Sequence, residues 1–175
     1  MSGDILLPAW YVLHTKSRFE NVVYDGLIKK SVEVFLPKVL IKSKRKDRKK
    51  MIRVPLFPGY VFVKTDLNPY HHLEILKTTG AVKLIGNKTE PVPVTGQTID
   101  SLKIMVRGDC PVMTGARFQS GDRVVVVNGP FAGVVGEFVR YKGEGRVVVT
   151  VAALGQYAAV EVSEEEVEIL PDLIS

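Results

Sequence analysis

The stretch Val54-Pro55-Leu56-Phe57-Pro58-Gly59-Tyr60-Val61-Phe62-Val63 passes from a proline-rich turn into an alternating run of apolar side chains. Proline has no backbone N–H for a central ladder, so a strand is expected to begin only after Pro58. The period of two places alternate side chains on opposite faces of that strand. One face carries Tyr60, Phe62 and Lys64, and the other carries Val61, Val63 and Thr65.

Both faces of this strand are largely apolar, which fits a strand covered on both sides or one that offers a face to a partner. We expect Val61 and Val63 to be core residues. For Phe57 and Tyr60 two interpretations stay open, because aromatic residues at loop edges serve equally as core and as interface anchors.

The composition indicates a globular protein of one medium or two small domains, with 175 residues and 46% hydrophobic content. No apolar run reaches membrane-spanning length, and the N-terminus lacks a signal-peptide pattern. The single Cys110 excludes an intrachain disulfide and a cysteine zinc cluster. These features favour a cytoplasmic protein without membrane contact.

The charge is divided unevenly along the chain. Residues 1–113 carry 19 Lys and Arg against 10 Asp and Glu, whereas residues 114–175 carry 5 against 9. A basic first part suggests a nucleic-acid partner, and an acidic second part suggests a different one.

The first 107 residues predict an α+β sandwich, in which helices pack on an antiparallel or mixed sheet. A helix is expected from Ser17, with Glu20 completing a capping box. Further helices are expected after Asn68 and after Thr95. The strands around them are expected at residues 9–15, 38–41, 52–56 and 81–85, with a short extended segment at 32–35.

Residues 42–53 connect the two expected hairpin strands and include the start of the second strand. They contain eight basic residues and one acidic residue. Like charges this dense cannot pack together, so the tip is expected to be solvated. One interpretation is a solubilising tip. The interpretation we favour is an arm that contacts phosphates, because the charge density exceeds what solubility needs. The candidates are Lys44, Arg45, Lys46 and Arg48.

The rest of the chain has a different pattern. Residues 108–120 have no periodicity and are expected to form a linker. Residues 121–175 contain five short apolar strands separated by glycine-containing turns, which predicts a small β-barrel.

The sequence contains no recognisable catalytic or metal-binding constellation, so we expect neither enzymatic activity nor a cofactor. The adjacent His71 and His72 do not match a metal pair at helical spacing. His14 is expected to be structural or a contact residue, and Cys110 has no cationic neighbour in sequence.

Four motifs in this order resemble the NusG family of transcription elongation factors. They are Trp10-Tyr11-Val12-Leu13, Phe57-Pro58-Gly59-Tyr60-Val61, Gly121-Asp122-Arg123-Val124 and Gly129-Pro130-Phe131-Ala132-Gly133, of which the last is the KOW motif. The resemblance implies an NGN domain (1–107), a linker (108–120) and an SH3-like KOW barrel (121–175).

The resemblance also implies a monomer that binds RNA polymerase and acts in elongation and antitermination. Its contacts with the clamp helices and the β subunit would come from Phe57, Pro58, Tyr60, Phe62, Ile99, Leu102 and His72. Lys16 and Arg18 would approach non-template DNA, and the basic tip would touch DNA or nascent RNA. Phe131, Ala153 and Leu154 would meet ribosomal protein NusE or the terminator Rho.

Two departures from the family pattern bear on the function. The prolines of residues 55–58 and the basic hairpin resemble specialised paralogues such as RfaH and the antiterminators of polysaccharide operons. Ala153-Leu154 stands where housekeeping members have a bulkier pair that includes Phe. The alternative function is a structural RNA-binding or ribosome-associated protein that uses the KOW motif and the basic arm.

Overall fold

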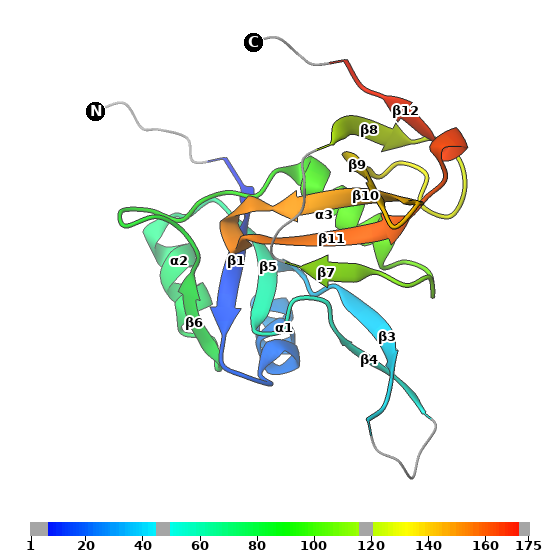
Figure 1. The fold of residues 1–175 in the computed structure, drawn as a ribbon. Coiled ribbons are helices and arrows are strands. Elements are labelled where there is room, and N and C mark those ends of the chain that lie inside the picture. The colour runs from blue at the N-terminus through cyan, green and yellow to red at the C-terminus, as the bar shows by residue number, and fades with distance from the viewer. Residues whose placement is uncertain (1–6, 45–49, 116–120, 172–175) are drawn as a thin grey trace. The chain divides into compact units, whose positions relative to one another are not determined.

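The computed structural model describes residues 7–44, 50–115 and 121–171 (Figure 1). It has two compact units, one made of residues 1–37 and 55–96 and the other of residues 38–54 and 97–175. The bounds of these units differ from the predicted domain boundaries. The division into domains at residues 107 and 121 therefore stays a prediction.

The first unit contains a four-stranded antiparallel sheet in the order β2-β5-β1-β6. The strands are β1 (Ala9–Thr15), β2 (Glu33–Phe35), β5 (Tyr60–Thr65) and β6 (Ala81–Leu84). Strand β5 begins at Tyr60, as the two prolines before it predict, and it pairs with β1 so that His14 faces Tyr60. The quoted stretch therefore supplies a central strand of the sheet.

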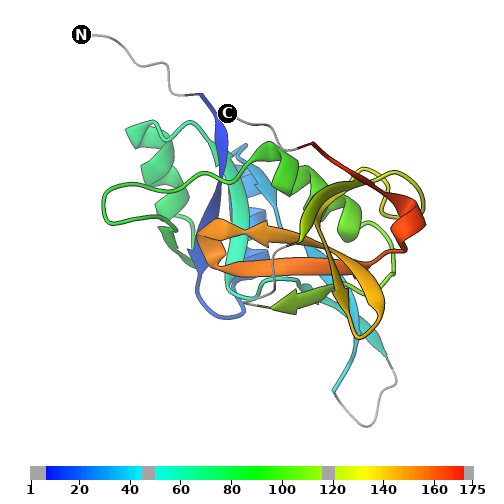
Figure 2. The ribbon, with the colours of Figure 1, turned by 45° about the horizontal axis from the view of Figure 1, so that its top comes forward.

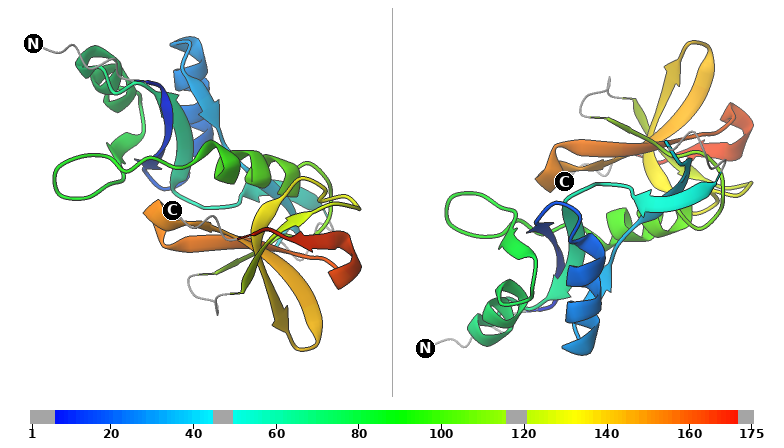
Figure 3. Two further views of the ribbon diagram at one scale, coloured as in Figure 1. Left: turned by 90° about the horizontal axis from the view of Figure 1, so that it is seen from above. Right: turned by 90° about the horizontal axis from the view of Figure 1, so that it is seen from below.

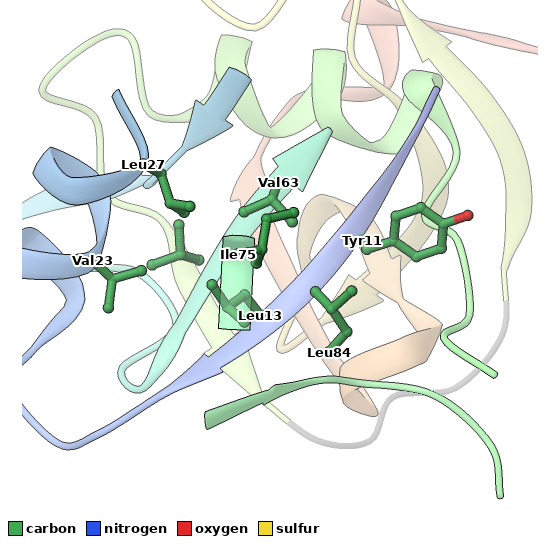
Figure 4. Packing of buried hydrophobic residues seen from close by; sticks show 8 residues of the cluster. Tyr11, Leu13, Val23, Leu27, Val63, Ile75 and Leu84 are labelled. Atoms are coloured by element: carbon green, nitrogen blue, oxygen red, sulfur yellow. The ribbon is translucent and has the colours of Figure 1, made fainter. Parts of the chain in front are cut away.

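Helices α1 (Glu20–Lys29) and α2 (Pro69–Leu76) both contribute to the core on one face of this sheet. Figure 4 shows Val23 and Leu27 of α1 and Ile75 of α2 gathered around the strands. The other buried members are Tyr11, Leu13, Val61, Val63 and Leu84. The prediction that Val61 and Val63 are core residues is confirmed.

The predicted start of α1 is wrong. The helix begins at Glu20, and its N-cap residue Phe19 makes no side-chain capping bond. Arg18 adopts a φ of 66°, so the chain turns sharply after Ser17 and the predicted capping residue lies outside the helix. The side chain of Glu20 turns away from the helix end to bond Gly59 instead.

The predicted start of α2 is confirmed. Asn68 is its N-cap and accepts a hydrogen bond from the Tyr70 N–H at 2.9 Å, and Pro69 is the first helical residue. Proline suits this position because its missing N–H would have no partner there.

The second unit includes a two-stranded ribbon of β3 (Lys38–Lys42) and β4 (Met51–Pro55), which confirms the predicted hairpin strands. It also includes most of α3 (Gly96–Met105), which begins directly after Thr95 as predicted. The buried Ser101 hydroxyl accepts from the Val135 N–H at 3.0 Å and lies 3.4 Å from the Val135 carbonyl oxygen. This pair attaches α3 to the first residue of strand β9 (Val135–Tyr141).

Six antiparallel strands complete this unit, in the order β12-β8-β9-β10-β11-β7 (Figures 2 and 3). Their bounds are Met113–Gly115 (β7), Asp122–Val126 (β8), Val135–Tyr141 (β9), Glu144–Val151 (β10), Gln156–Glu161 (β11) and Val167–Ile169 (β12). All five predicted strands are present. Among the described residues no strand pairing joins the β12 and β7 edges, so a closed barrel is not confirmed.

The predicted linker contains a strand. Residues 113–115 form β7, which pairs with β11 so that Met113 faces Ala159 and Gly115 faces Tyr157. Three residues are too few for a periodicity to be visible in the sequence, and their pairing partner lies more than forty residues further along. The sheet therefore takes up residues that local sequence reasoning assigned to a connection.

Candidate binding surfaces

The turn formed by residues 57–60 is hydrogen-bonded to helix α1 and to strand β1. The Gly59 N–H donates to Glu20 Oε1 at 2.8 Å, and the Thr15 N–H donates to the Gly59 carbonyl oxygen at 2.8 Å. The Tyr60 N–H also donates to the Phe57 carbonyl oxygen at 3.2 Å. Gly59 has a φ of 87°, which a residue with a side chain rarely adopts. The turn is therefore a preorganised surface element.

Only part of the predicted apolar pocket is accessible. Pro58 is exposed and Tyr60 is half-buried, with its ring stacked on His14 at a centroid distance of 5.3 Å. Phe57 and Phe62 are each 1% exposed, and their rings meet edge to face at 6.3 Å. The open question about Phe57 and Tyr60 thus has a different answer for each residue.

The two predicted residues of α3, Ile99 and Leu102, are fully buried. The family resemblance implies that both residues contact RNA polymerase together with the aromatic turn. Helical spacing correctly identifies the apolar side of α3, but it does not distinguish a face that is covered by the protein from a face that is open to a partner.

The turn between β1 and α1 carries the first two predicted nucleic-acid contacts. Lys16 and Arg18 are both exposed, and the Lys16 N–H donates to the Gly80 carbonyl oxygen at 2.8 Å. Backbone bonding thus holds this turn in place while the two cationic side chains remain available to an anionic partner.

Helix α2 borders a groove of about 690 Å³ that sequence reasoning missed. Its charged lining includes Lys30, Glu33, Lys64, Asp66 and Glu74. These residues come from separate segments, so no local sequence pattern could have revealed the groove. His72 is half-buried on α2, but it does not line the groove.

The neighbouring His71 does line the groove, and its Nδ1 lies 2.8 Å from Asp66 Oδ1. The hydrogen bond from His71, followed by that from the Asn68 N–H, lowers the pKa of the Asp66 carboxyl below its usual 3.8. The groove therefore has a carboxylate that stays ionised to lower pH than usual.

The basic tip is described only in part. Lys44 is exposed, as are Lys42, Lys50 and Arg53. The predicted contacts Arg45, Lys46 and Arg48 lie outside the described residues. The described cations flank the tip on both strands and remain compatible with a phosphate-binding arm.

The three predicted partner residues of the C-terminal sheet do not share one pocket. Phe131 is 6% exposed and borders a cavity of about 290 Å³ together with Met113 and Pro130. Ala153 and Leu154 are half-buried in a short 3₁₀ turn and are not part of that lining.

Within residues 7–44, 50–115 and 121–171, no three His, Cys, Asp or Glu side chains are grouped so that they could hold a metal ion. No helix in the described part of the chain is long and apolar enough to span a bilayer.

The fold is shared with a solved structure of NusG from Thermotoga maritima, with a TM-score of 0.54. The two chains are 24% identical, and the match covers 95% of this chain and 99% of the other. The likeness supports a mixed α/β fold of the NusG type.

The family model for "Transcription termination factor nusG" matches residues 8–103. The transcription termination/antitermination protein NusG of Pseudomonas aeruginosa is 30% identical over 174 residues, covering 91% of this chain and 97% of the relative. The transcription termination/antitermination protein NusG of Bacillus subtilis is 31% identical over 174 residues, covering 91% of this chain and 97% of the relative. The chain belongs to the NusG family.

Proposed function

We propose that this protein is a transcription elongation and antitermination factor that binds the clamp helices of RNA polymerase through the turn at residues 57–60. Family membership supports this function. The observation that carries it is the turn itself, where Glu20 and Thr15 hold Gly59 while Pro58 and Tyr60 reach the surface.

A turn held in this way suits an apolar docking site. An aromatic anchor provides contact area with few rotatable bonds, and a preorganised backbone loses little further entropy on binding. Phe57 and Phe62 lie beneath the surface and support the Tyr60 strand. Ile99 and Leu102 could touch the clamp helices only if their buried side of α3 became uncovered.

The mechanism is a population shift. If the protein binds the closed clamp more tightly than the open clamp, binding favours the closed polymerase. A closed clamp retains the nucleic acids, so elongation becomes more processive and pauses and termination less frequent. No covalent step is needed, which agrees with a non-enzymatic role.

Additional contacts would come from the basic and polar elements. Lys16 and Arg18 would face the non-template DNA strand, and His72 would face the β subunit. The basic tip at residues 42–53 would bind phosphates of DNA or nascent RNA without reading bases.

Within the family, we place the protein among specialised paralogues, acting as a cytoplasmic monomer. The support is the proline-rich turn and the basic hairpin. The C-terminal sheet would be the KOW domain, with NusE or Rho as its candidate partners through Phe131, Ala153 and Leu154. The small Ala153-Leu154 pair would make this contact weak, since little side chain is offered.

The test measures the affinity of Tyr60→Ala for the cognate polymerase core enzyme. Loss of a hot-spot aromatic should weaken binding by about 2 kcal/mol. Tyr141→Ala is the matched control, because Tyr141 is 51% exposed and lies on the C-terminal sheet. A native melting temperature with unchanged affinity would refute the docking site, and co-purification with ribosomal subunits instead of polymerase would favour the ribosome-associated alternative.

A further inference from the structure

The cavity of about 290 Å³ in the second unit has apolar walls. They are contributed by Pro111, Met113, Pro130 and Phe131. Phe131 is 6% exposed, and its carbonyl oxygen accepts from the Val134 N–H at 3.1 Å. Cofactor and drug-sized sites usually enclose about 300–1,000 Å³, so a cavity of this size suits a side chain better than a cofactor.

Two glutamates line the same cavity. Glu161 is the last residue of β11, and Glu166 is the last residue of the short 3₁₀ turn Glu164–Glu166. None of the described residues that line the cavity is a lysine or an arginine. The lining therefore combines apolar walls with negative charge that no cation of the lining balances.

The carboxylate of Glu166 is held in place. The Ser163 hydroxyl donates to Glu166 Oε1 at 3.1 Å, and a Cβ atom added to Gly129 would come within 2.7 Å of Glu166 Oε2. The Val127 N–H donates to the Glu166 carbonyl oxygen at 2.7 Å, and the residue is half-buried. A carboxylate fixed in this way loses little further freedom when it binds a cation.

Glu161 experiences repulsion from a neighbouring carboxyl. A hydrogen bond with Glu144, followed by the charge of Glu144, raises the pKa of Glu161 above its usual 4.5, and Arg146 acts in the opposite direction. The Arg146 guanidinium lies over the ring of Tyr141, at 4.6 Å from its centroid, and Arg146 does not line the cavity. A cation entering the cavity would relieve the remaining repulsion.

Long basic side chains have both properties that this lining requires. The methylene stem of arginine or lysine packs on apolar surface while its charged head reaches a polar border. The head can form charge-assisted hydrogen bonds with carboxylates, and arginine also suits the face of an aromatic ring such as that of Phe131. Residues 114–175 carry 9 acidic against 5 basic residues, which favours a basic protein over nucleic acid.

We propose that this cavity receives an arginine or lysine side chain of a partner protein, with its stem against Phe131 and its charge at Glu161 and Glu166. The inference rests on the proposed protein partner of the C-terminal sheet, which shares Phe131, and it names the chemistry of that partner. It does not depend on polymerase docking through Tyr60.

The experiment titrates the full-length protein with blocked tripeptides, which carry arginine, lysine or glutamine between two leucines, and with free spermidine. The methyl NMR signal of Met113 reports occupancy of the cavity, and that of Met51 on β4 is the internal reference. Cys110 is the single cysteine of the chain and lines the cavity. The rate of its alkylation by iodoacetamide is therefore a second readout.

The variant Glu161→Gln/Glu166→Gln removes both charges and keeps the shapes of the side chains. Glu165→Gln/Glu168→Gln is the matched control, because both of these residues are exposed and neither lines the cavity. Thermal melts of all variants test folding, and Glu161→Gln alone serves if the double variant melts early.

The arginine and lysine peptides are expected to shift the Met113 signal and to slow the alkylation of Cys110, whereas the glutamine peptide should do neither. The Glu161/Glu166 variant should bind the arginine peptide at least about fivefold more weakly, in line with the loss of two partly solvated ion pairs. Added salt should weaken binding further. The Glu165/Glu168 control should bind like the unchanged protein.

A glutamine peptide that binds as well as the arginine peptide, or an equal loss in the Glu165/Glu168 control, would overturn the proposal. The absence of any Met113 shift with up to about 10 mM arginine peptide would do the same. Spermidine that binds as tightly as the arginine peptide would assign the cavity to a free polyamine, against the proposed protein partner.

Binding of cognate NusE and Rho separates this inference from the proposed function. If the arginine peptide binds but neither protein does, those two candidate partners fail and the cavity site stands. If one of them binds the unchanged protein and the Glu161/Glu166 variant equally well, the cavity proposal fails alone.

Discussion

The carboxylate of Glu20, the first residue of α1, accepts a hydrogen bond of 2.8 Å from the backbone N–H of Gly59. The two residues are 39 positions apart in the chain. Glu20 is only 6% exposed, so this bond joins the start of a helix to the candidate docking turn in a largely dry environment. Glu20 is thus a positioning residue for the turn.

Replacement of Glu20 by Ala is expected to destabilise the protein by about 1–3 kcal/mol, because the Gly59 N–H loses its acceptor. Denaturant unfolding measures this change. Asp25→Ala, at an exposed position of the same helix, is the control and should change stability little. Equal stabilities of the Glu20 and Asp25 variants would contradict the positioning role.

The basic tip is expected to bind nucleic acid through phosphates. Changing Lys44, Arg45, Lys46 and Arg48 together to Ser should weaken binding to bare DNA or RNA and flatten its salt dependence, because fewer counterions are released. Polymerase docking through Tyr60 should persist. The measurement is a titration across a salt series, and identical slopes for both proteins would leave the tip with a solubilising role only.

Strand β7 is expected to stabilise the C-terminal sheet. A fragment of residues 108–175 should unfold at a higher urea concentration than one of residues 121–175, because β7 adds backbone hydrogen bonds along β11. A backbone hydrogen bond contributes about 1 kcal/mol net to stability. The free energies of unfolding of the two fragments should therefore differ by about 1 kcal/mol or more. Equal midpoints would contradict a stabilising role for β7, and two unfolded fragments would contradict the predicted independent domain.

The Asp66 carboxyl is expected to titrate below its usual pKa because His71 donates to it. A carboxyl whose pKa is lowered by folding adds stability above its unfolded pKa and loses that contribution as the pH falls through its folded pKa. In His71→Ala, NMR titration should give an Asp66 pKa closer to 3.8. His72→Ala is the neighbouring control, and the same Asp66 pKa in all three proteins would rule out the His71 bond in solution.

Sequence patterns correctly predicted those strands and helices that are determined by a few neighbouring residues. The alternation after Pro58 identifies β5, and Asn68 with Pro69 identifies the start of α2. The same kind of reasoning failed for Ser17 and Glu20, which match a capping box by spacing. Glu20 bonds a distant glycine, and that contact is invisible to a rule about four consecutive residues.

For the candidate site, too, the sequence predicted the position of an element but not the burial of its side chains. The sequence predicts a turn before β5, and the structure has one at residues 57–60, but the sequence left open which of its aromatic residues are exposed. Phe57 and Tyr60 are both aromatic and three residues apart, yet one is 1% exposed and the other half-buried. Similarly, the α2 groove is built from residues contributed by separate segments and has no sequence signature of its own.

The sequence by itself determined the strand and helix order, the basic hairpin and the family, because periodicity, proline placement and charge density act over a few neighbouring residues. Tertiary structure alone decided which aromatic residues reach the surface, where Glu20 bonds, that β7 joins the sheet, and that the sheet edges stay unpaired to each other among the described residues. These outcomes depend on which distant segments meet, and the balance of burial and backbone hydrogen bonding that selects them is a property of the whole chain.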